Sequence, residues 1–233
     1  MALIDNFKSF NRKERFILLH QALGFEGQSF RLGDSFRQEL SVCLSVTVPP
    51  DAFVAMDYHI DWLQMALYLT HKSLPKSRTV RNSDLVCGNQ EDIDLLIAFE
   101  HGETTHVVMI EAKGGTAWSN KQLLSKAARL ERVFGRGRPG TDTAVPHFVM
   151  ISPKKSNNIV TAEWPDWMKP NRGNPLWLEL TFPDGLMKPT RCTKDGTDDK
   201  SGGYIRIDIS SPRTPISDEE ADDTRAVSRY LEP

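Results

Sequence analysis

Features that would assign a protein class at once are rare or missing in this chain of 233 residues. Its three cysteines, Cys43, Cys87 and Cys192, lie far apart and form no C-x-x-C pair. This argues against a disulfide framework and a cysteine-based zinc site, and it fits a reducing compartment. No run of about 18 apolar residues is present, so we expect no membrane span.

Familiar enzyme motifs are also missing. The six histidines show no H-x-x-x-H spacing, which argues against a zinc centre. The glycine-rich segments lack the G-x-x-x-x-G-K-[ST] phosphate-binding loop, and no G-x-S-x-G nucleophile elbow occurs. Residues 1–6 hold no basic region followed by an apolar stretch, so we expect no secretory signal and a cytoplasmic protein.

Charge is nearly balanced overall but unevenly distributed. The net charge of −2 does not indicate a nucleic-acid binder. However, residues 119–140 are strongly basic, and acids outnumber bases in residues 216–233. The basic segment holds Lys121, Lys126, Arg129, Arg132, Arg136 and Arg138. Taken alone, this cluster is better explained as a solvated helix face than as a binding surface.

The first 78 residues are expected to be helical. Capping-box patterns at residues 11–14 and 35–38 begin two helices. Apolar residues at helical spacing predict a third helix over residues 57–70.

The pattern then changes to strands. Residues 93–100 and 106–113 read as two strands joined by a hairpin loop. A helix capped by Ser119 or Asn120 follows and runs to about Phe134, and residues 147–152 form the next strand. Strand, helix and strand in this order predict a right-handed crossover and a mixed sheet.

The last third is less regular. Residues 177–182 and 204–209 alternate like strands that could pair with each other, with a polar loop at residues 195–203 between them. Residues 211–233 are rich in Pro, Asp and Glu, which predicts a weakly ordered tail. We therefore expect a helical part over residues 1–78, a core over residues 79–210 and this tail.

Acidic and basic residues lie where the first two predicted strands meet. Asp94 belongs to one strand, and Glu111 and Lys113 share a face of its neighbour. Two carboxylates with a backbone carbonyl near Ala112 are ligands that suit Mg²⁺, which could activate a water while Lys113 orients or deprotonates it. Asp92 takes the place of Asp94 if the register shifts by two residues. An ordinary hairpin with solvated edge charges is the alternative.

These residues also resemble a known pattern. Asp94 followed by Glu111-Ala112-Lys113 is similar to the motif of the PD-(D/E)xK nuclease superfamily, which includes many restriction, repair and phage-defence nucleases. The resemblance covers roughly residues 85–155. It implies a restriction-endonuclease-like α/β fold, with a mixed β-sheet core flanked by helices and a helical N-terminal part.

The resemblance also implies roles for individual residues. Asp94 corresponds to the catalytic acid, Glu111 to the metal-binding glutamate and Lys113 to the catalytic lysine. Many members add a polar residue on the following helix, and Gln122 matches that position, with Lys126 as a second candidate. An additional acid from an earlier helix could be Glu39 or Asp61, a choice that the sequence leaves open. Ile93 stands where many members have a proline.

The sequence therefore predicts a Mg²⁺-dependent endonuclease acting on DNA, with Mn²⁺ as a substitute metal, in restriction or phage defence. The basic residues of segment 119–140 would contact phosphates. The alternatives are a non-catalytic nucleic-acid-binding module, or an interaction subunit of a defence complex with the same fold. A homodimer or a defence-complex partner is compatible with each.

Three tryptophans follow the core strands. Trp177 is expected in the core. For Trp164 and Trp167, which follow Lys154 and Lys155, packing under a loop and a nucleic-acid groove both stay open.

Overall fold

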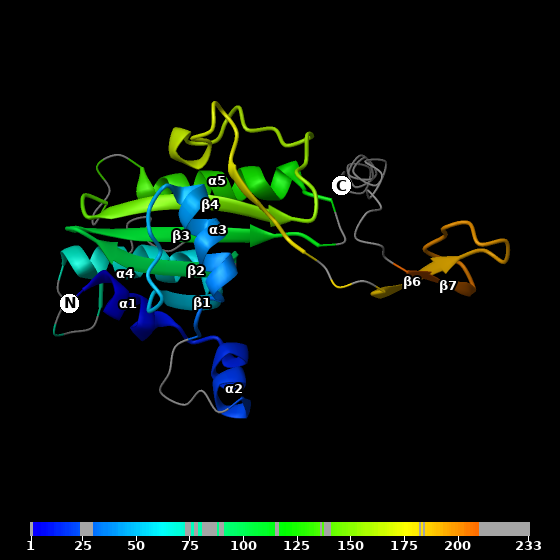
Figure 1. The fold of residues 1–233 in the computed structure, drawn as a ribbon, viewed down its shortest axis with the longest axis horizontal. Coiled ribbons are helices and arrows are strands. Elements are labelled where there is room, and N and C mark those ends of the chain that lie inside the picture. The colour runs from blue at the N-terminus through cyan, green and yellow to red at the C-terminus, as the bar shows by residue number, and fades with distance from the viewer. Residues whose placement is uncertain are drawn as a thin grey trace. The chain divides into compact units, whose positions relative to one another are not determined.

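Five strands form one mixed sheet in the order β1-β2-β3-β4-β5. The strands are β1 (Phe53–His59), β2 (Asp92–His101), β3 (Thr104–Ala112), β4 (Ala144–Ser152) and β5 (Leu176–Glu179). β2 pairs antiparallel with both β1 and β3, whereas β3 and β4 are parallel. The predicted α/β class with a mixed sheet is thus confirmed (Figure 1).

The computed structural model describes residues 2–23, 30–72, 76, 79–80, 88, 91–114, 117–135, 137, 141–181, 183 and 185–209. The chain divides into two compact units. Unit 1 comprises residues 1–112, 119–151 and 157–178, and unit 2 comprises residues 113–118, 152–156 and 179–233. The acidic tail predicted for residues 211–233 lies outside the described residues.

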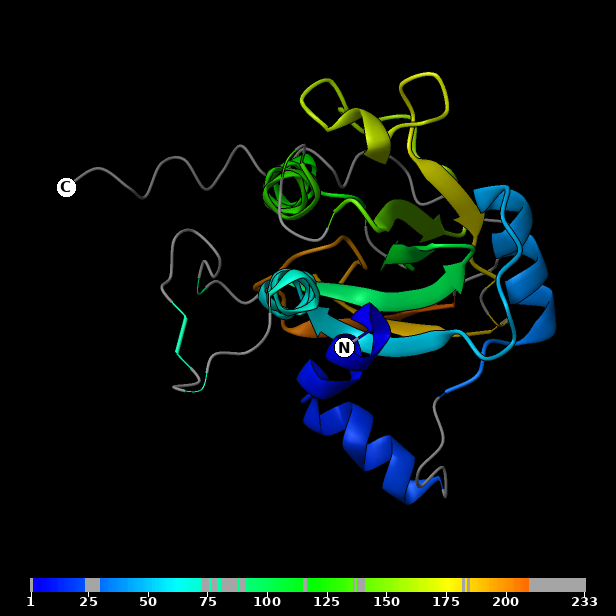
Figure 2. The ribbon, with the colours of Figure 1, turned by 90° about the vertical axis from the view of Figure 1, so that its left-hand side faces the viewer.

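Helices cover the sheet of unit 1 on both faces. Figure 2 shows α4 (Ile60–His71) and α5 (Asn120–Phe134) against one face and α3 (Asp34–Leu44) against the other. Because both faces are covered, β3 buries four consecutive apolar residues, Val107 to Ile110. The N-terminal helices are α1 (Leu3–Phe10) and α2 (Glu14–Ala22). α1 is tied to α4 by Asn6, whose side-chain amide donates to Thr70 Oγ1 at 2.8 Å.

The predicted hairpin and crossover helix are confirmed. β2 and β3 pair around the turn at Gly102 and Glu103. Ser119 is the N-cap of α5, and its hydroxyl accepts a hydrogen bond from the Gln122 backbone N–H. The apolar positions Leu123, Ala127 and Leu130 are buried, so α5 packs on the sheet through the stripe that its sequence predicts.

Three predictions about strands and helices were wrong. The capping boxes at residues 11–14 and 35–38 are not formed, since α2 and α3 have Lys13 and Gly33 as N-caps with no side-chain hydrogen bond. The helix expected to begin at Asp57 begins at Ile60, and the residues before it form β1, an edge strand paired with β2. The N-terminal segment, expected to be helical, therefore also contributes a strand to the sheet. The predicted pairing of residues 177–182 with 204–209 is also wrong, since β5 joins the five-stranded sheet.

Unit 2 contains a separate antiparallel pair. β7 (Tyr204–Ile209) pairs with β6 (Met187–Cys192), a strand that the sequence did not reveal. On one face of this pair Asp208 accepts hydrogen bonds from Thr190 and Arg206, which links the two strands through polar side chains.

Across the described residues, no helix combines the length and apolar character that a bilayer crossing requires.

Candidate functional site

Asp94 and Glu111 meet where β2 begins and β3 ends. Leu95 pairs with Ile110, and one step further along this antiparallel register Asp94 falls opposite Glu111. The backbone N–H of Ala112 donates to Asp94 Oδ2 at 2.7 Å. Asp94 is exposed, whereas Glu111 is buried. The two carboxylates that the sequence singled out therefore lie side by side, one facing solvent and one inside.

Lys126 of α5 neutralises the buried carboxylate. Its ammonium donates to Glu111 Oε1 in a short ion pair and to the backbone oxygen of Asp92 at 2.6 Å. Both side chains are at least nine-tenths buried. Burial raises the pKa of Glu111 to about 7, and the charge of Asp94 adds to this shift while Lys126 opposes it. Glu111 thus sits close to the balance between its protonated and ionised forms near neutral pH.

Lys113 directly follows the last residue of β3 and belongs to unit 2, whereas Asp94 and Glu111 belong to unit 1. Its predicted convergence with the two carboxylates therefore stays a prediction. Lys126, by contrast, is a lysine that the structure does place on Glu111.

A second group of ionic contacts surrounds Asp92. Lys13 Nζ lies 2.5 Å from Asp92 Oδ2, and His59 Nδ1 lies 2.7 Å from Asp92 Oδ1. Asp92 is thus a partly buried anchor for the segment before α2 and for the end of β1, and not a solvated charge. The backbone oxygen of Asp92 also accepts a hydrogen bond from Lys126. The contacts of Asp92 therefore help to position the lysine that pairs with Glu111.

Arg129 of α5 holds two further acids. Its guanidinium lies 2.8 Å from Asp61 Oδ1 and 3.2 Å from Glu91 Oε2, and its side chain is 8% exposed. Asp61, one of the two candidate helical acids, is therefore tied to Arg129. Glu39, the other candidate, is on α3 and accepts a hydrogen bond from Ser35. The structure thus gives each candidate acid a partner of its own, away from the motif residues.

The basic residues of the 119–140 segment separate into two groups. Lys121 and Arg132 are exposed on α5, as is Gln122. Lys126 and Arg129 are buried against acids, so their predicted role as phosphate contacts does not fit the structure. Arg136 and Arg138 lie outside the described residues.

The donor set of Asp94 and Glu111 fits Mg²⁺ in part. Two carboxylates are hard oxygen ligands, and Mg²⁺ commonly keeps several waters in place of further protein ligands. Among the described residues, no cluster of three or more His, Cys, Asp or Glu side chains is suited to hold a metal ion. Any ion here would therefore rely on two carboxylates with backbone and water oxygens.

Lys126 is the functional candidate that sequence reasoning placed least securely. Its signal was available: it stands within the apolar stripe of Leu123, Ala127 and Leu130, where a lysine must find a buried partner. The roles of Asp92, His59 and Lys13 had no comparable signal, because each depends on long-range contacts.

Comparisons of the chain with models of protein families, with curated proteins and with solved structures found no match. The resemblance to the PD-(D/E)xK superfamily therefore stands on the motif residues themselves. The restriction-endonuclease-like arrangement stays a prediction, and the α/β fold with its five-stranded mixed sheet is what the structure establishes.

Proposed function

We propose that this protein is a divalent-cation-dependent endonuclease that hydrolyses phosphodiester bonds in DNA. The observation that carries the proposal is the hydrogen bond from the Ala112 N–H to Asp94, which holds Asp94 near Glu111 at the end of β3, immediately before Lys113. A buried carboxylate beside a second carboxylate is costly unless a cation compensates it. Lys126 supplies part of that compensation, and a metal ion would supply more.

The protein's own groups divide the work as follows. Asp94, Glu111 and the backbone carbonyl of Ala112 would hold Mg²⁺, or Mn²⁺ in its place. The ion would supply polarisation of the phosphate and a lowered pKa of a bound water. Lys113 orients the attacking water or accepts its proton, and its charge offsets the charge that develops on the phosphate. Lys126 keeps the Glu111 carboxylate oriented without blocking the exposed Asp94.

DNA contacts come from the exposed face of α5 and from the basic residues that follow it in the sequence. Lys121 and Arg132 are exposed there, and Arg136 and Arg138 follow in the chain. Phosphate contacts of this kind make binding strongly salt-dependent. Gln122, exposed in the first turn of α5, is a further candidate for substrate contact. A role in restriction or phage defence, with a homodimer or partner that allows both strands to be cut, is part of this proposal.

The test is incubation of the purified protein with linear, supercoiled and single-stranded DNA in Mg²⁺, Mn²⁺ or EDTA. We expect cutting with either metal, none with EDTA, and loss in Asp94→Asn and Lys113→Ala. Lys8→Ala, which changes an exposed lysine on α1, is the matched control for Lys113→Ala. Cutting that persists undiminished in both site variants contradicts the proposal.

One observation favours a second candidate, a non-catalytic nucleic-acid-binding module. The ion pair with Lys126 already satisfies Glu111, as expected for a buried pair that serves structure alone. This candidate predicts a salt-sensitive shift of DNA in gels without cutting under any metal condition. Asp94→Asn would leave that shift unchanged.

A further inference from the structure

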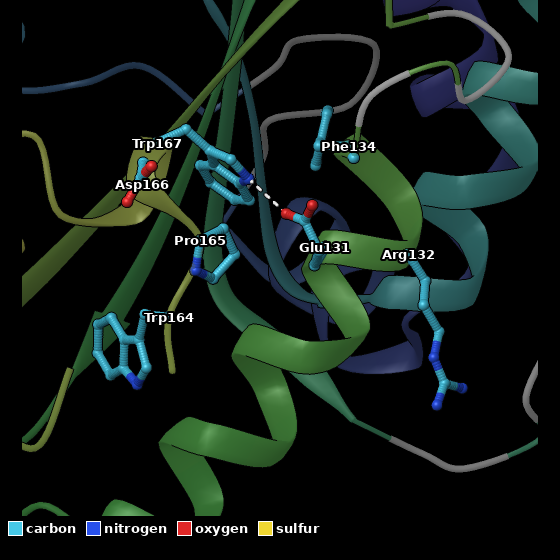
Figure 3. A pocket seen from close by; sticks show the side chains of 8 residues that line it. Glu131, Arg132, Phe134, Trp164, Pro165, Asp166 and Trp167 are labelled. Atoms are coloured by element: carbon cyan, nitrogen blue, oxygen red, sulfur yellow. Dashed lines mark hydrogen bonds between the residues drawn. The ribbon is translucent and has the colours of Figure 1, made fainter. Parts of the chain in front are cut away.

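A hollow of about 770 Å³ lies at the C-terminal end of α5. The last turn of the helix, from Glu131 to Gly135, forms one side, and residues Trp164 to Trp167 form the other (Figure 3). None of its lining residues belongs to the Asp94–Glu111 site or to the ionic contacts behind it. Its volume is in the range of small-molecule sites.

The wall opposite α5 is held in place by contacts at several points. Trp164 is 3% exposed and packs edge-on against Phe148 of β4, with ring centroids 5.7 Å apart. Asn120, at the start of α5, donates to Asn158 O and accepts from the Val160 N–H, both at 2.9 Å. The segment that carries Trp167 is therefore fixed to both the sheet and the helix, and the hollow exists before any ligand arrives.

Aromatic side chains shape the hollow. Trp167 donates its indole N–H to Glu131 Oε2 at 3.2 Å, which fixes the orientation of the ring. Phe134 meets Trp167 edge-on, at 5.6 Å between ring centroids and 66° between planes. Figure 3 shows Pro165 beside these groups. A Cβ at Gly135 would collide with the backbone oxygen of Glu131, so glycine is needed at this end of the helix.

The charge of the hollow favours a cation. Glu131 contributes a carboxylate, and the C-terminal end of a helix adds partial negative charge. Asp166 is a second acid, offset in part by Lys169 at 3.7 Å. Arg132, the basic lining residue, extends away from Trp167 in Figure 3. A phosphate would be repelled here, whereas aromatic faces with a carboxylate attract ammonium and guanidinium groups.

We propose that this hollow binds an organic cation, with an ammonium or guanidinium head resting against Trp167 and Phe134 and neutralised by Glu131. The two proposals share one residue, Arg132, which is a proposed DNA contact and also lines this hollow. Cation binding here does not depend on nuclease activity. The same head group could come from a free small molecule or from a modified lysine or an arginine in a peptide.

The test follows the indole N–H signal of Trp167 by ¹H–¹⁵N NMR, assigned with Trp167→Phe. Choline, tetramethylammonium and arginine amide are titrated against 3,3-dimethylbutan-1-ol, the neutral carbon counterpart of choline. We expect saturable shifts with the cations and binding of the neutral alcohol about 5- to 30-fold weaker. Equal binding of choline and the alcohol, tighter binding of a nucleoside monophosphate than of choline, or no saturable shift with any cation overturns the proposal.

Variants separate charge from structure. Glu131→Gln keeps an oxygen for the Trp167 indole but removes the charge, and it should weaken choline binding by about 5-fold or more. Asp166→Asn, a change at an exposed position, should weaken choline binding less than Glu131→Gln does. It provides the charge test if Glu131→Gln does not fold. Glu163→Gln, an exposed acid of the same segment outside the hollow, should have no effect. Unchanged choline binding in both lining variants contradicts the proposal.

A peptide arm identifies the source of the cation. A trimethyllysine peptide that binds more tightly than choline assigns the head group to a protein tail, and equal binding assigns it to a small molecule. Either result supports an organic-cation site.

Discussion

β3 has ionisable groups near both of its ends, and the two ends handle charge in opposite ways. At the Glu111 end, a buried carboxylate is paired with Lys126 and lies next to Asp94. At the His106 end, His106 Nδ1 lies 2.9 Å from His147 Nε2, with the rings stacked. Burial lowers the pKa of His147 to about 4, and the neighbouring His106 adds to the shift. The Glu111 end thus holds groups of opposite charge, whereas the His106 end holds two histidines that are kept neutral.

The difference indicates which end is better suited to the proposed chemistry with a cation. The two histidines, kept neutral by burial, satisfy one ring nitrogen each by their mutual hydrogen bond without an ion. A carboxylate whose pKa is raised to about 7 beside a second, exposed carboxylate retains a surplus of negative charge that a divalent ion can compensate. The proposed chemistry therefore belongs to the Glu111 end alone.

The largest expected effect is on cutting. Asp94→Asn and Glu111→Gln should each lower the rate of DNA cleavage by about 100-fold or more, because each removes charge that faces the ion and the transition state. His147→Gln, on β4, and Glu100→Gln, near the far end of β2, should leave the rate unchanged. Single-turnover cleavage assays measure both. Equal losses at the two ends would indicate that the sheet, not the Asp94–Glu111 pair, is what the variants damage.

Breaking the buried ion pair should be costly in a pH-dependent way. Lys126→Met should lower the free energy of unfolding by about 3–5 kcal/mol at pH 8, where the buried Glu111 must either stay ionised without its partner or take up a proton at an unfavourable pH. At pH 5 the cost should be much smaller, since Glu111 is then protonated. The double variant Glu111→Gln/Lys126→Met should recover much of the free energy of unfolding that Lys126→Met loses at pH 8. Urea unfolding at the two pH values measures this, and an identical loss at both would contradict the role assigned to Glu111.

The histidine end should respond to acid. The folded state holds His147 neutral down to a pKa of about 4, whereas an unfolded chain protonates it near its ordinary pKa of about 6.5. The contribution to stability is therefore complete above that value and is lost as the pH falls toward 4. We expect a loss of no more than about 2 kcal/mol, because the ring is partly exposed to solvent. His147→Gln should flatten this part of the unfolding profile, and an unchanged profile would exclude His147 as its cause.

The smallest effect concerns the exposed face of α5. Lys121→Gln should weaken DNA binding by less than about 1 kcal/mol and lower the salt slope by about 1, with no change in stability. Arg129→Gln is the contrasting variant, because it removes a buried partner of Asp61 and Glu91 and should destabilise the fold. Filter binding over a salt series and urea unfolding separate the two. If Arg129→Gln lowered the salt slope and left the free energy of unfolding unchanged, Arg129 would be a DNA contact and not a structural residue.

Local signals predicted much of the fold. The β2–β3 hairpin, the Ser119 cap and the apolar stripe of α5 follow from residues close in sequence, and each is present in the structure. β1 was missed because the helical spacing of Ile60, Leu63 and Leu67 extended the predicted helix back to Asp57. Asp57 has a φ of 50° within β1, which no strand pattern predicts.

Partners that are distant in sequence were harder to predict. Trp177 alternates with its neighbours as a strand does, but alternation does not say which strand it joins. The number of basic residues in segment 119–140 likewise could not show that Lys126 and Arg129 are buried. Their acidic partners, Glu111, Asp61 and Glu91, are distant in the sequence.

Calorimetric titration of Mg²⁺ or Mn²⁺ into the protein at pH 8 tests the Asp94–Glu111 site most directly. We predict saturable binding that Asp94→Asn weakens at least about 10-fold, a loss of about 1.4 kcal/mol, and that Glu100→Gln leaves unchanged. Saturable binding of equal strength in wild type and Asp94→Asn, or no saturable binding in the wild type, would contradict the assignment of this pair as a cation site.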